Sequence, residues 1–156
     1  MMEIKRIFYL IMSTCSLLIL CACSDNSDVS STEALTVDEY EITEEYYEDI
    51  RYIISEFVVY LEDNEMAITP ARTIENAEVY LSRVKDEELI PVTIADNELH
   101  IYASEFKLKS QLMAEYMLDY GETQNPKDML KANEYFEETR EALDMIKEIA
   151  YKYGLE

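Results

Sequence analysis

The residues best suited to hold a metal ion in this chain are three cysteines and a single histidine. Cys21 and Cys23 stand one residue apart, Cys15 precedes them, and His100 lies far along the sequence. A zinc site needs about four converging ligands, and His100 is the one distant partner for these cysteines. We therefore expect no metal site and no bound cofactor.

Motifs that would carry catalysis are also absent from the sequence. Di-metal helical bundles use Glu-x-x-His motifs, but Asn97 stands three residues before His100. There is no glycine-rich phosphate loop, zinc-binding histidine pair or nucleophile elbow either. We therefore predict that the protein is not an enzyme, and we interpret His100 as a surface or packing residue of a helix.

A cluster of acidic residues is the first of two candidate binding features. Its members recur at helical spacing: Glu41, Glu44, Glu45, Glu48 and Asp49. Like charges three or four residues apart destabilise a helix by roughly 0.2–0.5 kcal/mol per pair, which the helix dipole partly offsets at the first turn. The cluster is either a face for a divalent cation or a basic partner, or a solvated surface beside a tether. A calcium loop would need closely spaced Asp and Asn residues with a glycine, which this segment lacks.

Tyrosines are the second candidate feature, because the chain has 13 of them and no tryptophan. Four fall in one segment: Tyr46, Tyr47, Tyr52 and Tyr60. They could flank a groove for a sugar or a peptide. They could equally lie at the edge of a helical core, with each hydroxyl at the rim.

The N-terminal residues are typical of a secretory signal. Lys5 and Arg6 precede an apolar run from Ile7 to Leu20, and polar residues follow from Ser24 to Ser31. A membrane-spanning helix needs roughly 20 apolar residues, and this run is shorter. The order of a basic start, an apolar segment and small residues therefore favours a signal peptide over a spanning helix.

The end of that run, Leu20-Cys21-Ala22-Cys23, resembles the lipobox of bacterial lipoproteins. The resemblance implies cleavage after Ala22 and attachment of a diacylglyceryl group to the sulfur of Cys23. It also implies a mature chain with one acylated cysteine and no disulfide, at the extracytoplasmic face of the cell membrane. Two or more acyl chains are enough for stable anchoring.

The charge of the chain narrows the range of partners. Its 34 acidic residues outnumber 13 basic ones, for a formal net charge of -21. Phosphate binding needs a positive surface, so we expect no nucleic acid, and direct attraction to anionic headgroups is disfavoured. A hydrophobic fraction of 49% nevertheless argues against a disordered acidic tail.

Composition divides the chain into three parts. We assign residues 1–22 to the lipoprotein signal peptide, 23–35 to the lipidated cysteine and a flexible spacer, and 36–156 to one folded domain. Two glycines and three prolines in the whole chain favour helix over strand in that domain.

Apolar periodicity predicts a first helix over about 37–64. Thr36 with Glu39 forms a capping box at its start, and Leu35 with Tyr40 is placed as a hydrophobic staple. Apolar residues then recur three or four positions apart: Tyr46, Ile50, Ile53, Phe57 and Leu61.

Two pairs of a capping residue and a proline mark the starts of further helices. Thr69-Pro70 opens a second helix over about 70–89, and Asn125-Pro126 opens the last one, which stops at Gly154. The last helix has an uninterrupted apolar seam: Met129, Ala132, Phe136, Thr139, Leu143, Ile146, Ala150 and Tyr153.

The segment after the second helix allows two interpretations. Residues 90–102 could form a small hairpin with a turn at Asp96-Asn97. Alternatively, a helix could run over about 96–120 and stop at Gly121. We favour the helix, because apolar residues keep the helical spacing. Four helices with short connections predict an all-α fold, an antiparallel four-helix bundle.

These patterns predict a lipid-anchored bacterial lipoprotein whose helical domain has a non-catalytic binding or adaptor role at the cell surface. The expected partners are the membrane, through the lipid anchor, and a protein or basic peptide, with the first helix as the place of recognition. The alternative is a carrier of a small ligand or divalent cation, or a small enzyme, whose groove uses the acidic residues with Tyr46 or Tyr102.

Overall fold

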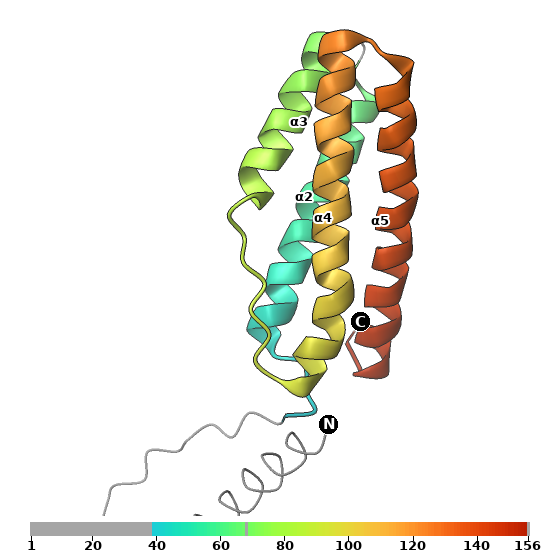
Figure 1. The fold of residues 1–156 in the computed structure, drawn as a ribbon. Coiled ribbons are helices and arrows are strands. Elements are labelled where there is room, and N and C mark those ends of the chain that lie inside the picture. The colour runs from blue at the N-terminus through green and yellow to red at the C-terminus, as the bar shows by residue number, and fades with distance from the viewer. Residues whose placement is uncertain (1–38, 68, 156) are drawn as a thin grey trace, which may run out of the picture. The chain divides into compact units, whose positions relative to one another are not determined.

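The computed structural model describes residues 39–67 and 69–155, which form four helices and no strand: α2 (Glu44–Glu65), α3 (Pro70–Val84), α4 (Ile94–Thr123) and α5 (Pro126–Lys152). Successive helices run in opposite directions along a common axis (Figure 1). α4 is the central helix, because it contacts each of the other three, whereas α5 packs along α4 alone. The predicted all-α antiparallel bundle is confirmed, and the predicted hairpin alternative is not formed.

α2 begins later than predicted, at Glu44 rather than near residue 37. Thr43 precedes it with an extended backbone, and its N–H donates to Asp96 Oδ1 (2.8 Å) instead of to an earlier carbonyl of a helix. The Glu39 carbonyl accepts from the Ile94 N–H (3.0 Å). Contacts with the start of α4 therefore replace the first turns of the predicted helix.

The other sequence signals for this helix have mixed outcomes. Thr36 and Leu35, which belong to the predicted capping box and staple, lie outside the described residues. The predicted apolar stripe is confirmed, except that Leu61 is half-buried and Tyr60 is buried at the far end. The buried residues of α2 are Tyr46, Ile50, Ile53, Phe57 and Tyr60.

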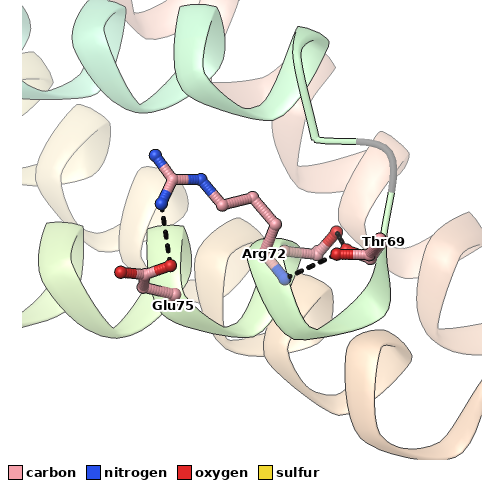
Figure 2. A network of polar contacts seen from close by, with 4 residues as sticks. Thr69, Arg72 and Glu75 are labelled. Carbon is pink, nitrogen blue, oxygen red and sulfur yellow. Dashed lines mark hydrogen bonds and ion pairs between the residues drawn. The ribbon is translucent and has the colours of Figure 1, made fainter.

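The predicted start of α3 is confirmed. Thr69 Oγ1 accepts a hydrogen bond from the Arg72 N–H at 3.3 Å (Figure 2). Pro70 is the first residue of the helix. One turn further on, Arg72 Nη1 pairs with Glu75 Oε2 at 2.8 Å (Figure 2). A local cap that needs no distant partner thus sets this helix boundary.

The predicted end of α3 is wrong, because the helix stops at Val84 rather than near residue 89. The acidic residues 86–88 would have placed three carboxylates at the negative end of the helix dipole. Instead, residues 85–93 run without helical structure down to the start of α4 (Figure 1). Lys107 Nζ of α4 donates to the Glu87 carbonyl and ties this connection to the bundle.

α4 extends beyond both predicted ends. At its start, Thr93 and Asp96 form a capping box that the sequence analysis missed, with Asp96 N–H donating to Thr93 Oγ1 (2.9 Å). At its end, the helix passes through the predicted stop at Gly121, and Gln124 adopts the left-handed cap instead (φ 54°).

Gly121 has a different role from the predicted one. It is buried against α3, and a Cβ at this position would lie 2.6 Å from Ile74 Cγ1 and 3.3 Å from the Pro70 carbonyl oxygen. The glycine is therefore required by the close approach of α3 and α4 and does not end the helix.

α5 agrees with its predicted limits. Asn125 Oδ1 accepts from the Lys127 N–H (3.2 Å) at the start, and Gly154 has the positive φ of 77° expected after a helix end. Of the predicted seam, Ala132, Thr139, Ile146 and Ala150 are buried. Its larger members are half-buried: Met129, Phe136, Leu143 and Tyr153.

Aromatic rings fill the space between α2 and the two helices that cover it. The Phe57 ring meets the Phe106 ring edge to face, with centroids 5.5 Å apart. The Tyr60 and Tyr80 rings stack with centroids 4.9 Å apart. Such pairs add about 0.5–1.5 kcal/mol each to the free energy gained by burial.

Candidate functional site

The predicted lipidation residue, Cys23, lies outside the described residues, as do the predicted signal peptide (1–22) and spacer (23–35). The other predicted site residues fall on α2 or just before it, except Tyr102 on α4, and all of them lie within the described residues.

The predicted acidic residues lie along the first two turns of α2 and just before it. Glu41, Glu44 and Glu45 are exposed, and Asp49 is half-buried. Glu48 Oε1 pairs with Arg51 Nη1 at 2.8 Å on the surface of the same helix. Within residues 39–67 and 69–155, no three or more Asp, Glu, His or Cys side chains are grouped closely enough to hold a metal ion.

The four predicted groove tyrosines point into different environments. Tyr46 and Tyr60 are 2% and 3% exposed and belong to the core. Tyr47 packs against the core and is half-buried, whereas Tyr52 is exposed. Tyr46 and Tyr60 therefore lie inside the core, Tyr47 lies at its edge, and Tyr52 faces solvent.

Tyr46 pairs with the single histidine. Its hydroxyl oxygen lies 2.9 Å from His100 Nδ1, and Ser104 Oγ lies 3.1 Å from His100 Nε2. Burial raises the pKa of Tyr46 well above its ordinary value, and the negative charges of Asp96 and Asp49 raise it further. His100 is thus a hydrogen-bonded packing residue, as the sequence analysis predicted.

Asp96 is the most densely hydrogen-bonded side chain at this end of the bundle. Its carboxylate accepts from Thr43 N–H (2.8 Å), Thr43 Oγ1 (2.9 Å), Val92 N–H (3.1 Å) and Thr93 N–H (3.1 Å). Thr93 Oγ1 in turn donates to the Glu41 carbonyl (2.8 Å). We call this network the Asp96 junction; it joins the segment before α2 to the first turn of α4.

The chemistry of the Asp96 junction is structural. Burial alone would raise the pKa of Asp96, but the hydrogen bonds from the backbone N–H groups of Thr43, Val92 and Thr93 outweigh burial and lower it. Because Asp96 is fully buried and its carboxylate accepts bonds from these donors, it anchors the chain rather than binding a ligand.

A small hollow lies beside the Asp96 junction, between the start of α2 and the connection that precedes α4. Its volume is about 270 Å³, and its lining combines carboxylates with aliphatic side chains: Thr43, Glu45, Tyr46, Asp49, Glu88, Ile90 and Val92. Three of the predicted site residues, Glu45, Tyr46 and Asp49, therefore do meet at one place.

A larger groove runs between α4 and α5. It consists of two hollows of about 410 and 460 Å³ that share Tyr102 and Met145. We call it the α4–α5 groove; its lining is Glu98, Ile101, Tyr102, Glu105, Glu138, Glu141, Ala142, Met145, Glu148, Ile149, Tyr151 and Lys152. Apart from Tyr102, the sequence analysis identified none of these as site residues.

One sequence signal could have pointed to this groove. Ile94, Ile101 and Leu108 recur every seven residues, but they fall off the buried stripe of α4 and are exposed. Aliphatic residues that keep a helical period on the wrong face indicate a second apolar contact.

In residues 39–67 and 69–155, none of the helices combines the length and the apolar character needed to span a bilayer. No protein-family model matches the sequence, and no curated protein or solved structure matches it significantly.

Proposed function

We propose that the protein is a lipid-anchored bacterial lipoprotein, displayed at the extracytoplasmic face of the cell membrane, whose helical domain binds a partner without catalysis. The proposed localisation rests on the motif Leu20-Cys21-Ala22-Cys23, which follows a basic start and an apolar run. In this proposal Cys23 becomes the first, acylated residue of the mature chain, and residues 24–35 separate the domain from the lipid surface.

The binding role is supported by surfaces that combine carboxylates with exposed apolar side chains. Both the hollow beside α2 and the α4–α5 groove have this composition. Carboxylates around an apolar floor favour a ligand that is itself basic and partly apolar, because opposite charges select the partner and apolar burial supplies affinity.

The proposed localisation and lipid modification can be tested on the full chain in the bacterial cell. Mass spectrometry of the membrane fraction should find a mature N-terminus at Cys23 with a diacylglyceryl modification, and Cys23→Ala should release the protein from the membrane fraction. Cys21→Ala is the matched control and should leave modification and retention unchanged. An N-terminus at Met1, or full membrane retention of the Cys23→Ala chain, would overturn the proposed lipid anchoring at Cys23.

A second candidate function, a carrier of a small basic ligand, is favoured by the hollow beside α2. Glu45, Asp49 and Glu88 line one small volume there. Calorimetry with a diamine should then show saturable binding that is lost in a Glu45→Gln, Asp49→Asn variant and kept in Glu62→Gln. Equal binding by both variants would exclude this carrier.

A further inference from the structure

The α4–α5 groove combines the exposed side chains of Ile101 and Tyr151 with glutamates from both helices. We propose that it binds a basic amphipathic helix of a partner protein, with the apolar face of that helix on Ile101, Tyr102 and Met145 and its basic residues against the surrounding glutamates. This inference rests on the binding role proposed above and is independent of the lipid anchor.

Besides the groove residue Ile101, the exposed face of α4 carries two more aliphatic residues, one heptad away on either side. Ile94, Ile101 and Leu108 are 52%, 63% and 54% exposed, respectively. Residues seven apart on a helix lie nearly in line, two turns from one another, and a helix packed alongside would cover them. On α5, Met145 lines the groove from the opposite side and Tyr151 is exposed at its end.

The charged part of the groove is strongly unbalanced. Glu98 pairs with Lys152 (2.7 Å), and Glu138 pairs with Lys109 (2.5 Å). The groove glutamates that form no ion pair within the described residues are Glu105, Glu141 and Glu148. A ligand with several lysines or arginines would therefore find carboxylates without an ion-pair partner on both helices.

The length of the groove suits a helix of a few turns. From Glu138 to Lys152, α5 advances about 21 Å at roughly 1.5 Å per residue. A helix with apolar residues at heptad spacing matches both this length and the spacing of the aliphatic residues on α4.

Charge favours a basic helix over two other possible occupants of the groove, a second copy of this chain and an anionic membrane. A second copy of this chain would bring glutamates against glutamates, because its net charge is -21 and both groove helices carry unpaired acids. An anionic membrane surface would be repelled for the same reason. A basic helix is the occupant whose charge and apolar face both fit.

The test uses photo-crosslinking from three exposed aliphatic positions. The full chain, in phosphatidylcholine vesicles, carries p-benzoylphenylalanine in place of Ile101 in the groove, Ile90 beside α2, or Val79 on α3. The probe is a labelled helical peptide of about three heptads, with leucine at positions a and d and lysine at e and g. Protein-free vesicles correct for peptide bound to lipid.

We expect an adduct through position 101 that is several-fold stronger than through positions 90 and 79. The same peptide with glutamate in place of lysine, and a scrambled lysine–leucine peptide without an apolar face, should give little adduct at position 101. Equal adducts through all three positions, or equal adducts with the glutamate or scrambled peptide, would overturn the proposal.

Charge-reversal variants give a second test of the groove. Glu105→Lys with Glu141→Lys should weaken binding of the lysine–leucine peptide about tenfold, because two attractions become repulsions. The control pair, Glu62→Lys with Glu78→Lys, changes the net charge equally at exposed positions of α2 and α3. This pair should weaken binding of the peptide less than about twofold. Equal weakening by both pairs would show nonspecific attraction and overturn the groove.

The outcomes also separate this inference from the proposed function. An adduct through position 90 alone would overturn the groove and leave the binding role standing, with its site beside α2. No adduct through any position would overturn both the groove and the proposal that the domain binds basic partners.

Discussion

The two sides of α4 are built in opposite ways. Toward α2 and α3, Asp96 and Ser110 are buried and hydrogen-bonded, and Gly121 allows close backbone approach. Toward α5, beyond the buried seam, the helix borders a groove with exposed aliphatic residues and unpaired carboxylates. Both sides of α4 pack against neighbouring helices, and the α5 side also carries the groove that we propose for partner binding.

The largest expected effect on stability is at the Asp96 junction. Asp96→Ala removes the acceptor of four hydrogen bonds and leaves the N–H groups of Thr43, Val92 and Thr93 without their partner, with Thr93 itself buried. We expect the free energy of unfolding to fall by roughly 3 kcal/mol, measured by urea denaturation of the full chain. Asp119→Ala, an exposed change on the same helix, should cost less than about 0.5 kcal/mol. Similar losses in both variants would mean that the junction is unimportant.

The pH dependence of the same junction gives the next effect. Because the folded-state pKa of Asp96 is lowered, its stabilising contribution is fully present above its unfolded-state pKa of about 4. It is lost as the pH falls through the folded-state pKa. The difference in unfolding free energy between wild type and Asp96→Asn should therefore shrink on acidification from about pH 7 to about pH 3. A constant difference over this range would contradict the assignment of an ionised Asp96.

A smaller effect is expected where α3 packs on α4. Tyr80 donates its hydroxyl hydrogen to Ser110 Oγ (2.6 Å), whereas the buried Tyr60 hydroxyl has no hydrogen-bond partner among the described residues. Tyr80→Phe should cost about 1 kcal/mol, and Tyr60→Phe should be neutral or slightly stabilising. Thermal and urea unfolding of the two variants measure this, and a larger loss from Tyr60→Phe would reverse the conclusion.

The stability of the fold should also depend on alkaline pH through Tyr80. Burial raises the pKa of Tyr80 to about 12, while the hydrogen bond with Ser110 opposes the shift. Stability from the protonated Tyr80 is present below its unfolded-state pKa of about 10 and is lost as the pH rises toward the folded-state value. Tyr80→Phe should therefore lose less stability than wild type between about pH 9 and about pH 11. Parallel losses in the two proteins would contradict this.

The smallest effect on stability is expected on the groove side of α4. Ile101→Ser with Leu108→Ser changes two exposed side chains and should alter the free energy of unfolding by less than about 0.5 kcal/mol. Leu99→Ala, a buried change on the same helix, should cost about 3 kcal/mol. The serine variant should nevertheless lose binding of the lysine–leucine peptide. A large loss of stability would show that the groove side is part of the core.

Local signals in the sequence predicted the fold well. The caps at Thr69 and Asn125 are made by a side chain and a backbone N–H two or three residues away, so their outcome depends little on the rest of the chain. The apolar stripes of α2 and α5 likewise follow from helical geometry alone. The predicted number, order and direction of helices are therefore confirmed.

Features that depend on another helix were predicted less well. The start of α2 is displaced because Thr43 binds Asp96, which lies 53 residues away. Gly121 resembles a helix stop in sequence, but the reason for it is the side chain of Ile74 on α3. The α4–α5 groove needs the relative placement of two helices, which periodicity in either helix does not contain.

The Asp96 junction also has a mechanical consequence. A pulling force that enters the domain through the chain before Glu39 meets the bonds from Ile94 to Glu39, from Thr93 to Glu41 and from Thr43 to Asp96 before it reaches α2. The load is thereby shared with the first turn of the central helix. The hydrogen bonds of Asp96 therefore take up tension applied from the N-terminal side before α2 begins to unwind.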